Sequence, residues 1–157
     1  MTRLGAAKVG LFLRQQADEL TRIWRLARVS ARPAVFPGLL DGVVTPFFRT
    51  CGELLPQHRA PEEVWTELSG VVWWQTALAP AELVEEWAVM SEVVSAACEA
   101  VNAEPAVGEW LVRAIAACQT GTAALGSSRD QAPPGILAAL VYSEVAPRRP
   151  AEKDGAA

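Results

Sequence analysis

The chain has 157 residues, enough for one domain with a buried core, and 51% of them are hydrophobic against 20% charged. Charged or polar residues interrupt every long apolar run, which argues against a membrane-spanning helix of about 20 residues, and the apolar patch after Met1 ends at Arg14, too soon for a secretory signal. The net charge of −4 argues against nucleic acid as a main partner, so we expect a cytoplasmic protein that binds neither membrane nor nucleic acid.

Apolar residues recur at helical spacing along most of the chain. The spacing predicts five helices, over about residues 6–29, 37–55, 61–78, 80–102 and 105–125. Pro46 is expected to kink or split the second helix, and Pro61 and Pro105 are expected in the first turns of the third and fifth. Alternating strand patterns are nearly absent. The sequence therefore predicts an all-α fold, a globin-like or bundle-type stack of helices.

The helix predicted over 80–102 has two unlike faces. Its apolar stripe is expected to be buried and consists of Leu83, Trp87, Met90, Val94, Ala97, Cys98 and Val101. Glu85, Glu92 and Glu99 recur every seven residues on the opposite side. We interpret these carboxylates as a solvated face, with an acidic docking strip for a partner as the alternative.

The composition changes after Leu125. Residues 126–157 read as a linker, a short apolar segment over 133–145 and a disordered, weakly basic tail that contains Arg148 and Arg149. We therefore predict one helical domain over residues 6–125. The segment 133–145 is a candidate for docking on a partner or back on the domain.

Six tryptophans are unusual for a chain of this length. Trp24, Trp87 and Trp110 lie on apolar stripes, where burial is the simplest interpretation. Trp73 instead lies about 150° from the expected inward stripe of the third helix. Its neighbours on that face are small, and together with Trp74 at the border they give a candidate interface of Thr66, Gly70, Trp73, Trp74 and Ala77. This face either joins two copies of the chain or is covered by another helix of the same domain.

Chemical sites are not evident in the sequence. His58 is the single histidine and lies in a predicted loop, and Cys51, Cys98 and Cys118 are too far apart for a disulfide framework or a zinc motif, which indicates reduced core thiols. Glycine-rich phosphate loops are absent. We therefore expect no catalytic residue, no metal, no cofactor and no enzymatic activity.

Three segments resemble a known family. Residues 12–24 (FLRQQADELTRIW) resemble the opening helix of the RsbRD amino-terminal domains, the sensory domains of stressosome co-antagonist proteins. Residues 37–48 (PGLLDGVVTPFF) resemble the second helix of that family, and residues 82–94 (ELVEEWAVMSEVV) its fourth segment. The likeness covers about residues 7–125. Trp87 and the Met90–Ser91 pair depart from the residues more common in the family.

The resemblance implies a globin-like, cofactor-free helical domain that dimerises and precedes an output domain. Because the tail occupies the place of an output domain, we expect a free-standing sensory or adaptor module that acts through protein partners, in a signalling or scaffold complex, as a homodimer. A second hypothesis is a small-molecule or cofactor sensor with its pocket among Trp24, Trp87, Met90 and Trp110. A third is an enzyme whose site the sequence does not display.

Overall fold

The computed structural model describes residues 1–31, 40–76 and 80–130. These residues form six α-helices and one short 3₁₀-helix, which confirms the all-α prediction. The elements are α1 (Arg3–Gln15), α2 (Ala17–Ala31), α3 (Asp41–Leu54), η1 (Leu55–Gln57), α4 (Glu63–Thr76), α5 (Pro80–Ala100) and α6 (Pro105–Asp130). The predicted disordered tail and the 133–145 segment lie outside the described residues.

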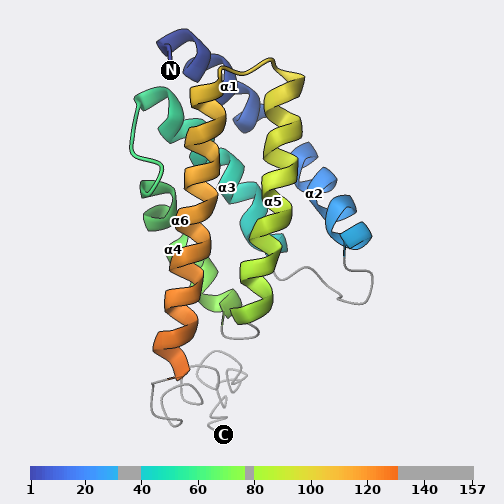
Figure 1. Ribbon diagram of the computed structural model, residues 1–157, viewed down its shortest axis with the longest axis vertical. Coiled ribbons are helices and arrows are strands. Elements are labelled where there is room, and N and C mark those ends of the chain that lie inside the picture. The colour runs from blue at the N-terminus through green and yellow to red at the C-terminus, as the bar shows by residue number, and fades with distance from the viewer. Residues whose placement is uncertain (32–39, 77–79, 131–157) are drawn as a thin grey trace, which may run out of the picture.

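The helices form a bundle-type stack around α3. α5 and α6 run side by side along most of their lengths and share the most extensive helix–helix contact (Figure 1). α3 contacts α1, α2 and α4, α2 also packs against α5, and α4 packs mainly against α6. Each helix is therefore held by at least one long-range neighbour, so the fold does not depend on isolated helix stability.

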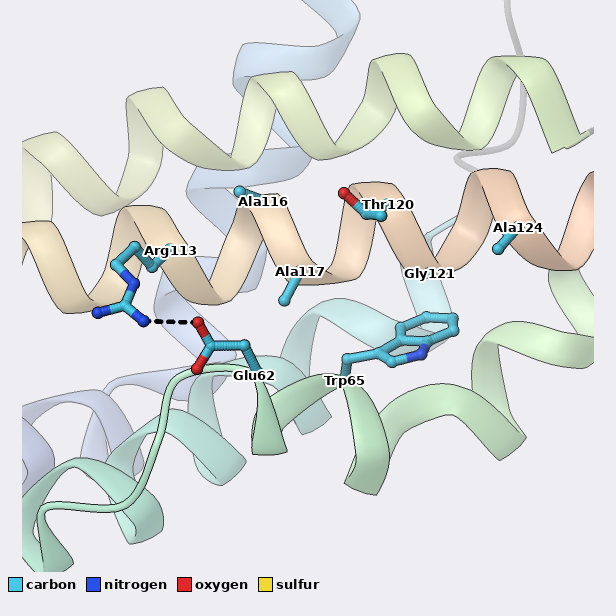
Figure 2. A pocket seen from close by; sticks show the side chains of 8 residues that line it. All are labelled: Glu62, Trp65, Arg113, Ala116, Ala117, Thr120, Gly121 and Ala124. Carbon is cyan, nitrogen blue, oxygen red and sulfur yellow. Dashed lines mark hydrogen bonds and ion pairs between the residues drawn. The ribbon is translucent and has the colours of Figure 1, made fainter.

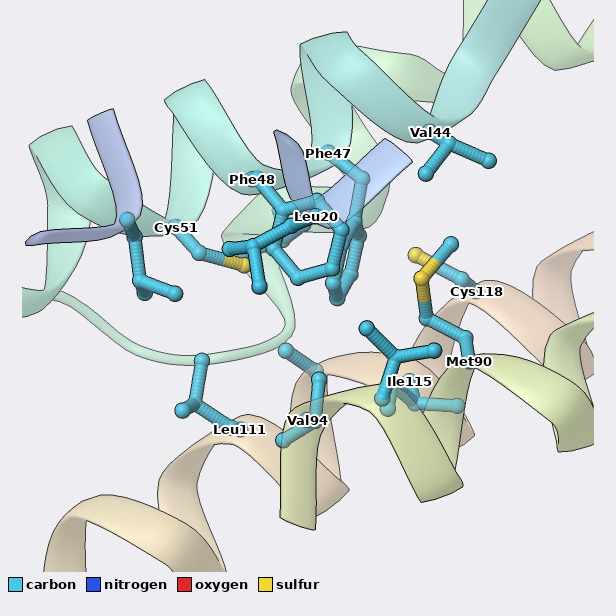
Figure 3. Packing of buried hydrophobic residues seen from close by; sticks show 14 of the residues in the cluster. Leu20, Val44, Phe47, Phe48, Cys51, Met90, Val94, Leu111, Ile115 and Cys118 are labelled. Atoms are coloured by element: carbon cyan, nitrogen blue, oxygen red, sulfur yellow. The ribbon is translucent and has the colours of Figure 1, made fainter. Parts of the chain in front are cut away.

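One apolar core lies where α3 faces α5 and α6. Phe47 and Phe48 of α3 lie opposite Met90 of α5 and Ile115 of α6, and all four side chains are buried (Figure 3). The Phe47 ring meets the Trp87 ring edge-on, with centroids 5.5 Å apart, a favoured aromatic geometry. The stripe predicted for α5 is confirmed at Trp87, Met90, Val94 and Ala97, which are buried, whereas Cys98 and Val101 are only partly buried and the Leu83 side chain is not described. Helical spacing also predicts an inward stripe on α6, and its residues are all buried: Val107, Trp110, Leu111, Ala114, Ile115 and Cys118.

The first predicted helix is two helices, because the chain bends at Gln16. Beside the bend, the Thr21 hydroxyl donates to the carbonyl of Ala17 (2.7 Å), an arrangement that commonly bends helices. The two halves also pack on different partners. α1 lies against α3 at a point where Gly10 and Gly52 bring the backbones together, since a Cβ on Gly52 would lie 2.6 Å from the Gly10 carbonyl oxygen.

The second predicted helix is not split at Pro46, and within the described residues it begins at Asp41. Pro46 lacks the amide that would bond the Gly42 carbonyl, but Gly42 is exposed, so water can satisfy that carbonyl. The burial of Phe47 and Phe48 directly after the proline favours an unbroken helix. Tertiary packing here outweighs the local cost of proline.

Three further predictions need correction. α6 continues to Asp130, so residues 126–130 are helical rather than linker. Helical spacing predicts Val71 on the inward stripe of the third helix and Ile23 on that of the first, but Val71 is 41% exposed and Ile23 is 37% exposed. Both residues lie at the margin of a buried stripe that is narrower than the apolar sequence pattern. Apolar residues at such margins are common on protein surfaces.

Candidate functional site

The start of α4 is fixed to α6 by polar contacts. The indole Nε1 of Trp110 donates to the carbonyl of Arg59 (2.8 Å), and the Arg113 guanidinium donates to Glu62 (2.7 Å). Glu63 accepts from the amide of Ala60 (3.1 Å), three residues before it. α4 begins at Glu63, so Pro61 precedes the helix. The prediction that Pro61 lies in the first turn of this helix is wrong.

Charge and hydrogen bonds stabilise the ionised forms of the two carboxylates at this end. A backbone hydrogen bond within Glu62 and then the bond from Arg113 lower the pKa of Glu62. The bond from Arg59 and then the amide of Ala60 lower the pKa of Glu63. Both side chains are therefore charged at neutral pH, and this end of α4 carries a paired set of charges beside α6.

Beyond this charged end, α4 and α6 form an open groove of about 510 Å³. The α4–α6 groove is lined by Glu62, Trp65, Arg113, Ala116, Ala117, Thr120, Gly121 and Ala124 (Figure 2). The Trp65 ring lies against Gly121, where a Cβ atom would overlap the ring, so only glycine permits this approach. The groove therefore has an aromatic edge, a floor of small side chains and one ion pair at its end.

The structure describes part of the candidate interface on α4. Thr66 and Gly70 are exposed, and apart from the backbone of α4 itself no atom of the described residues lies within 4 Å of the position that a Gly70 Cβ would occupy. Trp73 is half-buried. These three residues, here called the α4 outer face, border the groove around the circumference of α4. Ala77 lies outside the described residues, and the surroundings of the Trp74 side chain are not described.

The acidic face of α5 is solvated where it is described. Glu92 and Glu99 are exposed, whereas the position of the Glu85 side chain is not described. Glu92 and Glu99 give this surface of α5 an acidic character.

Sequence reasoning missed a buried ion pair. Arg28 of α2 donates through Nε to Glu86 of α5 (2.7 Å), and the second carboxylate oxygen of Glu86 accepts from the amide of Leu40 (2.7 Å). Arg28 and Glu86 are 3% and 1% exposed. This node joins α2, α5 and the residue that precedes α3. A signal existed, because Glu86 precedes Met90 by four residues and Val93 by seven, which places it on the buried stripe.

The residues of the alternative sensor pocket are core residues. Trp24, Trp87 and Met90 are fully buried, and Trp110 is nearly so. The Trp87 indole donates to the hydroxyl of Thr122 (3.0 Å), and that hydroxyl donates to the carbonyl of Cys118 (2.7 Å). Among the described residues, the Trp24 indole Nε1 is the buried side-chain nitrogen or oxygen without a hydrogen-bond partner.

His58 is exposed, whereas the three cysteine thiols are wholly or partly buried. His58 is exposed and ends η1 in the left-handed region (φ 54°). Burial raises the pKa of the Cys51 thiol and raises that of Cys118 to about 12, and partial burial raises that of Cys98. Raised thiol pKa values disfavour the reactive thiolate. Within the described ranges, the titratable side chains do not form a group of three or more that could hold a metal.

The described helices include none that is both long enough and apolar enough to cross a bilayer. The chain matches no protein-family model, no curated protein and no solved structure. The groove between α4 and α6 and the outer face of α4 are the candidate functional surfaces.

Proposed function

We propose that this chain is a non-enzymatic regulatory or adaptor module that acts through protein–protein contacts and forms a homodimer through the α4 outer face. The carrying observation is the open space at Gly70. A helix from a second copy can approach closely there, because Gly70 and Thr66 present little bulk. Val71, 41% exposed, adds apolar area beside this point.

The resemblance to stressosome sensory domains supports the same proposal, because that family implies helical domains that dimerise and work through partners. The proposal places the chain in a signalling or scaffold complex in the cytoplasm. A small-molecule sensor remains the rival function, and its pocket would have to open among Trp24, Trp87 and Trp110.

The dimer is tested with two matched glycine substitutions. Gly70→Arg puts a charged side chain into open space on the α4 outer face, so the subunit should fold normally but fail to associate. Gly108→Arg makes the same change on α6, where the Cβ position also meets no atom within 4 Å, and should leave the dimer intact. Light scattering on the eluting protein measures the mass against 16.8 kDa per subunit.

The expected masses are a dimer for the unsubstituted chain and for Gly108→Arg, and a monomer for Gly70→Arg. A monomeric unsubstituted chain, or a dimeric Gly70→Arg variant, would refute the dimer through α4. A Soret band on addition of haem to the purified protein would favour the rival sensor function.

A further inference from the structure

The floor of the α4–α6 groove continues as one stripe along α6. Arg113, Ala117, Thr120 and Ala124 recur every three or four residues, and Glu109 extends the same stripe one turn beyond Arg113. From Arg113 to Ala124 the stripe is about 16 Å long at 1.5 Å per residue. Its central side chains are small, so a second helix can pack closely against it along Trp65.

The chain itself supplies a segment of matching length and position. α6 ends at Asp130, only about 9 Å along the axis beyond Ala124. Pro133 and Pro134 cannot continue that helix with backbone bonds, so they favour a reversal of the chain. Five residues, 131–135, can span up to about 17 Å, enough to return to the groove across the roughly 10 Å between packed helices.

The sequence after the reversal has the pattern of a helix with one apolar face. Ile136, Leu137, Leu140 and Val141 share that face at helical spacing, and residues 136–145 would be about 15 Å long as a helix. This length matches the groove. Residues 136–145 are called the return segment below.

Charge fixes the direction of the return segment. Antiparallel to α6, it would start near Ala124 and bring Glu144, which lies on the same face as Leu140, to the Arg113 end of the groove. Arg148 and Arg149 would then reach the carboxylates of Glu62 and Glu109 just beyond. Opposite charges therefore meet at the far end of the groove, and the parallel direction would lose both matches.

We propose that the return segment of the same chain docks antiparallel in the α4–α6 groove, with Leu140 against the small side chains of α6. The inference goes beyond the proposed dimer, because it concerns a different surface and one copy of the chain. A docked return segment covers the groove and competes with any partner helix that would bind there.

Thiol labelling of the full-length protein tests this docking. Thr120→Cys places a reporter in the exposed floor of the groove, in a Cys98→Ser background that leaves only the two buried native cysteines. Leu140→Asp removes the apolar contact, whereas Tyr142→Asp makes a similar change on the opposite face of the return segment. Thermal unfolding followed by circular dichroism checks that each variant keeps the helical fold.

Leu140→Asp should accelerate labelling of the reporter by about tenfold, because a buried leucine contributes at least the 1.4 kcal/mol that corresponds to a tenfold change in an equilibrium. Tyr142→Asp should label at the unsubstituted rate. Equal rates in all three proteins would overturn the proposal, as would acceleration by both substitutions.

Concentration separates the possible occupants. Protection that stays constant on dilution supports docking within one chain. Protection that disappears on dilution, or in the Gly70→Arg variant, would overturn it and assign the groove to a second copy. Because labelling and mass are measured separately, loss of the dimer with retained protection leaves the docking proposal standing and refutes only the dimer.

Discussion

The Arg28–Glu86 pair gives the sharpest test of how the fold is held together. Glu86→Gln removes the charge with little change of volume, and the Gln carbonyl can still accept from the Leu40 amide. The Arg28 guanidinium, 3% exposed, then stays buried but loses the Glu86 charge to which its Nε donates. Breaking a buried ion pair by removing one partner costs about 3–5 kcal/mol. We expect Glu86→Gln to lower the free energy of unfolding by that amount.

A second variant separates the cost of a buried charge from the cost of the lost contacts. Arg28→Met alone leaves a buried carboxylate and should also cost about 3–5 kcal/mol. Combined with Glu86→Gln, however, it removes both charges and keeps an acceptor for the Leu40 amide. The double variant should therefore be more stable than either single variant, with a coupling of at least about 2 kcal/mol.

Urea unfolding followed by circular dichroism measures all four proteins of this cycle. The linear extrapolation gives each free energy, and an unchanged slope shows that the cycle compares the same transition. Single substitutions that cost less than 1 kcal/mol, or costs that simply add in the double variant, would refute the claim that this pair is an obligatory buried node.

Three other predictions follow from packing, hydrogen bonding and burial. Gly52→Ala should destabilise the protein by about 1–3 kcal/mol because the added methyl group separates α1 from α3. Gly108→Ala, in open space, should stabilise it by up to about 1 kcal/mol. Thermal melts compare the two variants, and equal effects would contradict the close approach of α1 and α3 at Gly52. Trp87→Phe loses a buried hydrogen bond that Trp24→Phe does not, so urea unfolding should find it costlier by about 1–3 kcal/mol, and the reverse order would be evidence against this assignment. The pKa of Cys118 is about 12 in the folded protein against a usual 9.0, so the folded state holds the thiol proton more tightly than the unfolded state. The contribution of this thiol to stability is therefore complete below pH 9. Between pH 9 and 12 the free energy of unfolding falls by about 1.4 kcal/mol per pH unit. Stability measured from pH 8 to 10.5 should therefore fall less steeply in Cys118→Ala, and parallel curves would refute the raised pKa.

The sequence predicted the helices better than their joints. The stripes of α5 and α6 could be read directly because residues such as Met90 and Ile115 recur at regular spacing. The bend at Gln16 could not, since the apolar spacing continues through it and only the different partners of α1 and α2 separate the two helices. Spacing reports which face is buried, but not against which helix.

The candidate site was only partly predictable. The small residues around Gly70 could be recognised on one helix, whereas the α4–α6 groove needs Trp65 and Gly121, which lie 56 positions apart and meet only in the fold. The Arg28–Glu86 pair likewise joins residues that are far apart in the sequence and meet only in the fold. Glu86 could have been recognised as a polar residue on a buried stripe, but its partner 58 positions earlier could not. Long-range pairings are set by topology, which a single sequence does not display.

The Glu86 carboxylate also bears on how this protein opens. One of its oxygens accepts from Arg28 of α2, and the other accepts from the amide of Leu40 before α3. Detaching either helix therefore breaks a hydrogen bond to this buried carboxylate. Partial opening of α2 or α3 alone is therefore costly, and these helices and α5 should exchange their amide protons with solvent as a single unit. Frequent local opening should instead occur in α1, α4 and α6, which the Glu86 carboxylate does not connect.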